Sequence, residues 1–255
     1  MKYRYTYTVQ YQDVDATRRI RLHTLENYLL NVAGRVADEL GFGIPALLPM
    51  GYTWIITRLS LEMLYLPKHG DVLVFETWIE QNAHLLSVRD YTIYIQDAKG
   101  DETLLGKAKS VWAILDLDKR EMVNIFDLPM FAGKVDGEVL DIAKPRRLLP
   151  IRMESSDPEA LGVGAMDHTI MYSDVDYNMH CNSCRYLEWM LNSCPWSDGA
   201  HPMRLDINYT KELHLGECMH TQYLQKEASI QYQQIDDNGH ACCTAQISHI
   251  DSLSC

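Results

Sequence analysis

The sequence predicts an α+β fold in which one unit, a long helix followed by an antiparallel sheet, occurs twice in the chain. Two observations support this prediction. Hydrophobic periodicity indicates a single long helix followed by four β-rich runs, and the same order returns in the second half of the sequence. With 255 residues, the chain is long enough for one large domain or two small ones.

The clearest element is a helix over residues 24–40. Apolar residues recur there at spacings of three and four, from Leu25 to Leu40, so that one face of the helix is wholly apolar. Thr24 is the expected N-cap, and Gly41 is expected to end the helix.

Four β-rich runs follow the helix and predict an antiparallel meander. They are separated by short turn-forming segments and comprise Trp54–Tyr65, Asp71–Gln81, Leu85–Gln96 and Leu104–Leu117. We assign two of their aromatic residues, Trp78 and Trp112, to the core. Prolines and glycines then interrupt the pattern over residues 127–164, which we interpret as a linker.

The two halves can be aligned residue by residue. At an offset of 161, the run Tyr11–Asp15 falls on Tyr172–Asp176, and at an offset of 146, Gly70 falls on Gly216. The offset changes only between elements, as expected for a duplicated unit whose loops have shortened. We therefore predict a tandem double hotdog fold, each unit being a long helix wrapped by a curved antiparallel sheet. The N-terminal unit spans 1–126, the linker 127–164 and the C-terminal unit 165–255.

A fused pair of this kind resembles an isologous dimer joined into one chain. The fusion already satisfies the dimer contact, so we expect either a monomer or a homodimer of the whole chain.

The charge balance limits the choice of partners. The net charge is −12, which makes binding to nucleic acid or to an anionic membrane surface improbable. An acidic partner would need a local basic patch, and two clusters qualify. One comprises Arg18, Arg19 and Arg21, and the other comprises Lys144, Arg146, Arg147 and Arg152.

Composition and cysteine usage indicate a cytoplasmic protein. No stretch approaches 18 uncharged apolar residues, so no membrane span is expected, and the first residues lack the apolar run of a signal peptide. All seven cysteines lie at or after Cys181. An odd number in one half of the chain is not a disulfide framework, and we interpret them as reduced thiols.

The residues best suited to catalysis precede the helix of the second unit. Asp176, Asn178 and His180 combine a carboxylate, an amide and an imidazole near a helix N-terminus. Such an imidazole can activate water, the amide can orient it, and backbone N–H groups at the helix start can hold an oxyanion.

Comparing the repeats indicates one working site per chain. The pairs at offset 161 are Asp176 with Asp15, Asn178 with Thr17, and His180 with Arg19. Because only the aspartate is kept, the amide and the imidazole are not a general requirement of the unit. The alternative interpretation is a turn carboxylate beside a surface histidine.

Metal sites are not expected. A calcium loop starting at Asp174 would need glycine at Met179 and glutamate at Arg185. A zinc site formed by His180, Cys181 and Cys184 lacks a second ligand pair with suitable spacing. We therefore predict neither metal nor cofactor.

At these residues the chain resembles a known family. Asp176-x-Asn178-x-His180-x-Asn182, followed by Tyr186 and Trp189, resembles the signature of the acyl-acyl-carrier-protein thioesterases of bacteria and plant plastids. The resemblance covers nearly the whole chain. It includes the block Asn208–Leu213, in which Leu213 stands where many plant members have cysteine.

The resemblance implies a catalytic set of Asp176, Asn178, His180 and Glu212. Because a leucine cannot act as a nucleophile, the expected route is direct hydrolysis. Water is positioned by Asn178 and activated by Glu212 or His180, and Asp176 orients the cluster. A covalent acyl-enzyme through Asp176 is the competing route.

The resemblance also implies that the first unit holds the acyl chain and that the two basic clusters bind acyl carrier protein, which is strongly acidic. The expected walls of the acyl slot are Leu29, Val32, Trp54, Ile56 and Arg58. Three alternatives stay open: an acyl-coenzyme A thioesterase, a dehydratase of the same architecture, and a non-catalytic module that binds acyl chains.

Overall fold

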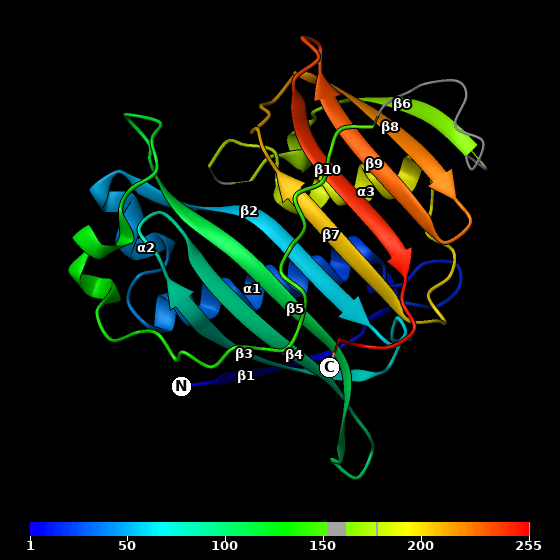
Figure 1. Cartoon of the computed structure of the whole chain (residues 1–255), viewed down its shortest axis with the longest axis horizontal. Helices are drawn as coiled ribbons and strands as arrows, with labels where there is room; N and C mark the ends of the chain where they lie inside the picture. The colour runs from blue at the N-terminus through cyan, green and yellow to red at the C-terminus, as the bar shows by residue number, and fades with distance from the viewer. Residues whose placement is uncertain (152–161, 177, 255) are drawn as a thin grey trace.

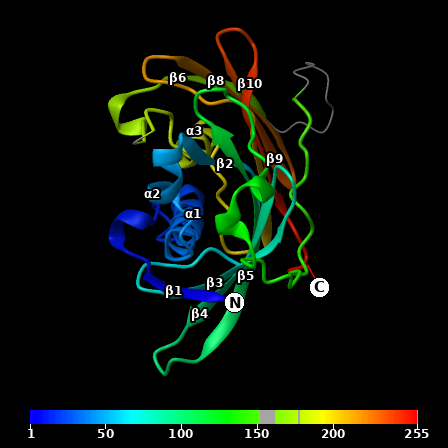
Figure 2. The same ribbon diagram turned by 90° about the vertical axis from the view of Figure 1, so that its left-hand side faces the viewer.

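The structure is a computed structural model that describes residues 1–151, 162–176 and 178–254. Its main feature is a continuous antiparallel sheet with helices on one face (Figures 1 and 2). The described strands are β1 (Tyr3–Thr8), β2 (Tyr52–Met63), β3 (Val72–Asn82), β4 (Ser87–Gln96), β5 (Glu102–Asp116), β6 (Gly162–Thr169), β7 (Met203–Tyr209), β8 (Cys218–Lys226), β9 (Ser229–Asp236) and β10 (Ala241–His249). The α-helices are α1 (Leu22–Glu39), α2 (Ile44–Leu47) and α3 (Ser183–Ser193).

The strand order shows the duplication directly. It runs β1-β3-β4-β5-β2-β7-β10-β9-β8-β6, so each unit repeats the same order outward from a shared centre. The units join where β2 pairs with β7, with Ser60 opposite Asp206. These two residues are equivalents at offset 146, so a pseudo-two-fold axis passes between them. The predicted α+β architecture of two helix-plus-sheet units is confirmed.

The boundaries of the first helix differ slightly from the prediction. Helix α1 begins at Leu22, two residues earlier than expected, and Arg21 rather than Thr24 is its N-cap. Its other end agrees with the prediction: Gly41 has a φ of 80°, a left-handed conformation that glycine adopts without strain and that ends a helix.

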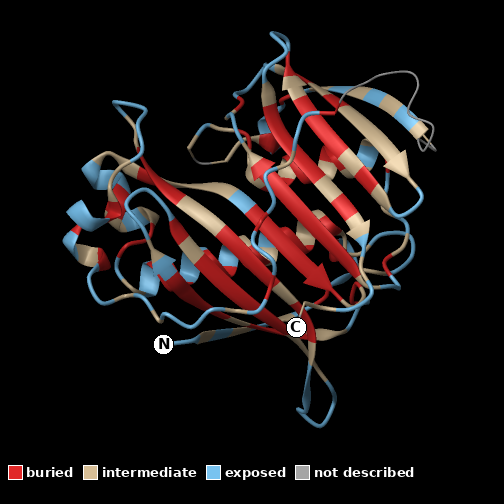
Figure 3. Cartoon of the chain, in the orientation of Figure 1, coloured by how far each residue is buried: buried red, intermediate tan, exposed pale blue. Residues whose placement is uncertain are grey.

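The central core lies between the helices and the concave face of the sheet. Helix α1 buries Leu25, Leu29 and Val32, each with 0% exposure, against apolar residues of β2, β7 and their neighbours. Figure 3 shows the same distribution, with buried residues concentrated on the sheet and exposed ones in the loops. Trp78, predicted in the core, is 1% exposed.

The two units differ most around the end of α1. Helix α3 has 11 residues and α1 has 18, and α1 is followed by α2, which has no α-helical equivalent after α3. Strand β2 likewise starts earlier than β7 relative to the offset of 146. These additions lie at one end of the N-terminal unit (Figure 1).

Residues 140–151, in the described part of the segment between the units, cross the outer face of the sheet, opposite the helices (Figure 2). Their backbone N–H groups bind side chains there: Arg146 donates to Asp206 at 3.1 Å and Leu148 donates to Asn208 at 3.1 Å. This segment therefore covers polar residues of the outer face. Residue 152, assigned to the second basic cluster, lies outside the described residues.

No described helix combines the length and the apolar character needed to cross a membrane.

Candidate active site

The loop before α3 is organised by one carboxylate. The Oδ1 atom of Asp176 accepts the backbone N–H of Asn178 at 2.8 Å and that of His180 at 3.4 Å. The N–H of Asp176 donates to the carbonyl of His180 at 2.8 Å, and Met179 turns the chain with a φ of 64°. Asp176 therefore holds the backbone that carries both candidate side chains.

Helix α3, which follows this loop, has Asn182 as its N-cap. The side chain of Asn182 accepts the N–H of Cys184 at 3.0 Å, an N-cap that starts α3. The cavity described next is lined by Ser183, so the helix begins at its wall. The positive end of the helix dipole therefore lies where a negative oxygen would be stabilised.

The four candidate catalytic residues line one cavity. Its volume is about 490 Å³, and its walls include Asp176, Asn178, His180 and Glu212. The His180 Nδ1 atom is 3.6 Å from Glu212 Oε1, and the His180 ring lies edge-on to that of His214, with 4.9 Å between centroids. The His180 side chain is 18% exposed and that of Glu212 is 28% exposed, so water reaches both.

A cation from the other unit completes this group. The Arg120 guanidinium, in the turn after β5, forms an ion pair with Glu212 Oε2 and lines the same cavity. Sequence reasoning missed Arg120, because nothing in its local pattern shows that the turn after β5 reaches the second unit.

The cysteines near the site are unsuited to nucleophilic attack. Burial raises the pKa of Cys181 to about 12, so its thiol stays protonated at neutral pH. Leu213 is fully buried in the core. Within the described part of the chain, no group of three histidine, cysteine or acidic side chains is arranged to hold a metal ion.

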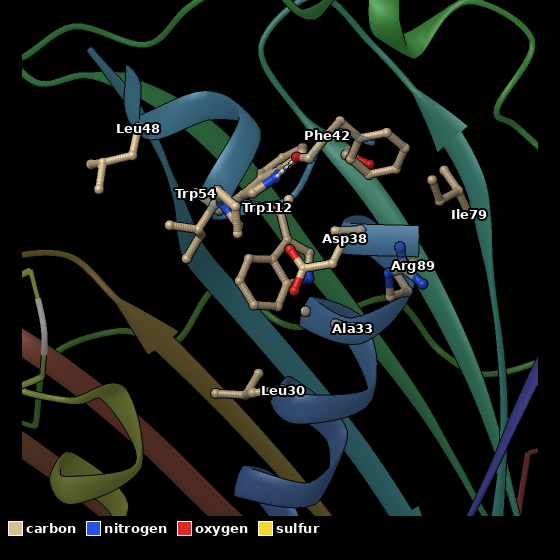
Figure 4. Close-up of a pocket in the computed structure, with 15 residues that line it drawn as sticks. Leu30, Ala33, Asp38, Phe42, Leu48, Trp54, Ile79, Arg89 and Trp112 are labelled. Carbon is tan, nitrogen blue, oxygen red and sulfur yellow. Dashed lines mark hydrogen bonds between the residues drawn. The ribbon is translucent and has the colours of Figure 1, made fainter. Parts of the chain in front are cut away.

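A second cavity adjoins the first. Its volume is about 550 Å³, and Figure 4 shows that it is lined mainly by apolar side chains from α1, α2 and the sheet, with Asp38 and Arg89 also at its wall. Ile44, Trp54 and Trp112 line both cavities, so the two adjoin at these side chains and the second lies within the N-terminal unit. Trp54 is fixed there, because its Nε1 donates to the carbonyl of Phe42 at 2.9 Å.

Only two of the five predicted acyl-slot residues line these cavities. Trp54 and Ile56 do so, whereas Leu29 and Val32 face the central core instead. The neighbouring stripe of α1 forms this wall of the cavity, with Leu30, Ala33, Gly34 and Ala37. An apolar helix face is wider than one row, so periodicity alone does not separate the core row from the row beside it.

Arg58 and Trp112 also differ from expectation. Arg58 is exposed, because the register of β2 shifts between Ile56 and Arg58 and this bulge reverses which residues face the helix. Trp112, assigned to the core, is half-buried and lines both cavities. A prediction that assumes strict alternation of inward and outward residues along a strand cannot anticipate a β-bulge.

Neither predicted basic cluster lines the catalytic cavity. In the first cluster, Arg19 donates to the carbonyl of Leu66 at 2.6 Å and Arg21 to that of Gln12 at 2.7 Å. Lys144, Arg146 and Arg147 are exposed on the segment that crosses the outer face. The cations that line the cavity are Arg120 and Lys211.

Comparison with known proteins agrees with this geometry. A family model described as the acyl-ACP thioesterase N-terminal domain matches residues 1–128, and the corresponding C-terminal domain model matches residues 164–251. Among relatives, the chloroplastic oleoyl-acyl carrier protein thioesterase of Coriandrum sativum is 24% identical over 99% of this chain. The chloroplastic palmitoyl-acyl carrier protein thioesterase of Arabidopsis thaliana is 27% identical over 76% of it. The chain spans 71% of the length of the first protein and 47% of the second.

Solved structures share the whole architecture. An acyl-ACP thioesterase from Bacteroides thetaiotaomicron is 25% identical, with a TM-score of 0.77 and coverage of 98% of both chains. The 12:0-ACP thioesterase from Umbellularia californica is 17% identical with a TM-score of 0.80 over the same coverage, a similarity of fold. Both halves of the chain therefore match in sequence and in three dimensions, and the protein belongs to the acyl-ACP thioesterase family.

Proposed function

We propose that this protein hydrolyses the thioester of an acyl chain carried by acyl carrier protein and releases a free fatty acid. The observation that carries the proposal is the pair of adjoining cavities. A polar cavity with an imidazole, two carboxylates and an amide meets an apolar cavity at the side chains of Trp54 and Trp112. A thioester bound at the junction would have its alkyl tail in the apolar part and its reacting carbon in the polar part.

In the proposed reaction, Asn178 holds a water molecule against the thioester carbonyl, and His180, with Glu212 beside its Nδ1, takes a proton as the water attacks. The carbon–sulfur bond breaks, the thiolate leaves with that proton, and the acyl group is released as the acid. Asp176 keeps the loop in place through its two backbone hydrogen bonds. The N-terminus of α3 stabilises the negative oxygen that forms on the carbonyl.

An acyl-enzyme formed on Asp176 is the competing route. Single turnover in ¹⁸O-labelled water separates the two. Direct attack puts the label only into the fatty acid and never acylates the protein. An acyl-aspartate leaves label in the carboxylate of Asp176 when water attacks its side-chain carbon, and it is detected as an acylated Asp176 peptide after rapid quenching when water attacks the fatty-acyl carbon. Label recovered in the peptide that contains Asp176 would replace direct hydrolysis as the mechanism.

The partner in this proposal is acyl carrier protein, docked through positive side chains. Charge reversal of Arg18, Arg19 and Arg21, or of Lys144, Arg146 and Arg147, should raise KM for the carrier-linked substrate while leaving turnover of the coenzyme A thioester unchanged. Unchanged KM in both variants would move the docking surface elsewhere, for example to the rim of the cavity at Lys211.

We also propose a reducing compartment, with the cytosol as the expectation. The six described cysteines are free thiols, and five of them are buried: Cys181, Cys184, Cys194, Cys242 and Cys243.

The decisive test measures thiol release from acyl carrier protein and coenzyme A thioesters of graded chain length. We expect faster release from the carrier-linked series and its loss in Asp176→Ala, His180→Ala and Glu212→Ala. Faster release from coenzyme A would favour the acyl-coenzyme A thioesterase. Dehydrated acyl product without thiol release would identify a dehydratase, and tight acyl binding without any product would identify a binding module.

A further inference from the structure

Glu212 is shared between two partners, one from each unit. Its Oε1 lies 3.6 Å from His180 Nδ1, and its Oε2 pairs with the Arg120 guanidinium. Each carboxylate oxygen therefore has its own partner. The carboxylate therefore lies between the imidazole and the guanidinium.

The turn that carries Arg120 is held by hydrogen bonds to Asp116. Asp116 Oδ1 accepts the backbone N–H groups of Asp118 and Lys119, each at 3.0 Å, and the N–H of Arg120 donates to the Asp116 carbonyl at 2.9 Å. Arg120 itself has a φ of 58°, in the left-handed region that non-glycine residues seldom occupy. The turn places the half-exposed Arg120 side chain at the wall of the catalytic cavity.

The turn is also anchored to its own unit on both sides. The N–H of Leu117 donates to the carbonyl of Gly51 at 2.9 Å, and that of Val123 to Ile114 at 2.8 Å. Arg120 therefore belongs to the rigid frame of the N-terminal unit, whereas Glu212 belongs to the loop after β7. Their ion pair crosses the boundary between the units at the catalytic histidine.

We propose that Arg120 is a positioning residue. It holds Glu212 as an oriented anion, so that Glu212 acts as the electrostatic partner of His180 and the imidazole alone accepts the proton of the attacking water. This inference rests on the proposed function, and it assigns the base that sequence reasoning left open between His180 and Glu212. A guanidinium suits this role because it stays charged at any working pH and presents several donors in one plane.

The charged and titratable groups around His180 set the sign of the test. Asp176 lies on its own loop, Glu212 and His214 lie on the loop after β7, and Arg120 comes from the turn after β5. Lys211, which also lines the cavity, pairs with Asp236. Removing Arg120 removes a positive charge and frees Glu212 to pair with His180. Both changes favour the imidazolium, so the pKa of His180 should rise.

The experiment compares Arg120→Met, Arg120→Lys and the control Lys119→Met. Lys119 is the adjacent cation of the same turn, paired with Asp116 at 3.3 Å and 72% exposed. We expect Arg120→Met to lower kcat about 10- to 100-fold with little change in KM. The acid limb of its kcat/KM profile should move to higher pH. Arg120→Lys should recover part of kcat and part of the pH shift, and Lys119→Met should match the wild type in both.

A second measurement does not depend on turnover. Imidazole titration by NMR of the ¹³C-labelled protein should show His180, assigned with His180→Gln, titrating at higher pH in Arg120→Met than in the wild type or Lys119→Met. An unchanged His180 titration together with unchanged kcat would overturn the role of Arg120. A rise in KM alone, with kcat and the titration unchanged, would also overturn it and make Arg120 a substrate contact.

The outcome is separable from that of the proposed function. If the wild-type protein releases no thiol from any thioester, the proposed function fails, and the NMR titration still reports on the Arg120–Glu212–His180 arrangement. If the wild-type protein is active and Arg120→Met is equal to it in rate and titration, only the positioning role fails.

Discussion

The two copies of the aspartate turn have nearly the same backbone and different surfaces. In the first unit the N–H of Asp15 donates to the Arg19 carbonyl at 2.9 Å, and Asp15 Oδ1 accepts the N–H of Thr17 at 2.8 Å. The positive φ of Met179 also has its counterpart, since Arg18 has a φ of 67°. In the second unit Asp176 makes the same bonds to His180 and Asn178.

This comparison distinguishes the residue that the turn needs in order to fold from the residues that could carry out the reaction. The aspartate is needed in both copies, because it satisfies backbone N–H groups in a tight turn, and its presence alone says nothing about catalysis. What distinguishes the second copy is the amide and the imidazole that this turn presents to a cavity. In the first unit the equivalent positions carry Thr17, whose hydroxyl returns to Asp15, and Arg19, which binds the carbonyl of Leu66.

The largest expected difference between the copies is in turnover. His180→Ala should lower kcat about 10²- to 10⁴-fold, because the only imidazole at this turn is lost as a base. Asn178→Ala should also lower it, whereas Thr17→Ala at the equivalent position should retain wild-type kcat. Thiol release from an acyl carrier protein substrate measures all three. Loss of kcat in Thr17→Ala would mean that the first copy takes part in the reaction.

A second contrast lies on the two central helices. Glu26 of α1 is fully buried, and its equivalent in α3 is the apolar Leu187. The Tyr209 hydroxyl donates to Glu26, but burial outweighs this bond and raises the pKa of Glu26 to about 8. The folded state therefore holds a proton that the unfolded chain releases above its ordinary pKa of 4.5.

The sign of the resulting stability change follows from linkage. Folding requires uptake of this proton between about pH 4.5 and pH 8, so wild-type stability falls over that range, by up to about 1.4 kcal/mol per pH unit. Glu26→Gln keeps an acceptor for Tyr209 without the titration. Its free energy of unfolding should exceed that of the wild type by an amount that grows up to about pH 8 and then levels off. Urea unfolding at several pH values measures this, and a constant difference between the two proteins would contradict it.

The aspartates themselves provide a smaller and more symmetrical test. Asp15→Ala and Asp176→Ala should each reduce the free energy of unfolding by about 1 to 2 kcal/mol, since each removes the acceptor of backbone N–H groups in a turn. Only Asp176→Ala should also lower kcat. Urea unfolding and thiol release on the same samples separate the two effects. Equal activity losses would mean that the first turn acts on catalysis through the fold.

The smallest effect concerns the apolar cavity. Gly34 lines it, and a Cβ at this position would meet no atom within 4 Å. Gly34→Leu should therefore fill part of the cavity and shift preference to shorter acyl chains, by about 0.8 kcal/mol for each methylene that loses its place. A chain-length series of kcat/KM measures the shift, with Gly34→Ala as the matched control. An unchanged preference would place the acyl chain elsewhere.

The sequence prediction lacks strands β1 and β6, which precede the helices of the two units. Sequence by itself determined the long helix with the strands after it, the duplication and the candidate catalytic loop. These depend on local rules: helical spacing over residues 24–40, turn residues between β-rich runs, and offsets that survive in both halves. Asp176, Asn178 and His180 lie within five residues, so one loop was certain to bring them near each other.

Tertiary structure decided everything that depends on contacts between distant residues. The bulge in β2 turned Arg58 outward, and the row of α1 beside Leu29 became the cavity wall, because pairing register and packing partners are long-range properties. The ion pair between Arg120 and Glu212 joins residues 92 positions apart. No local sequence pattern predicts this contact, because it depends on how the two units pack together across β2 and β7.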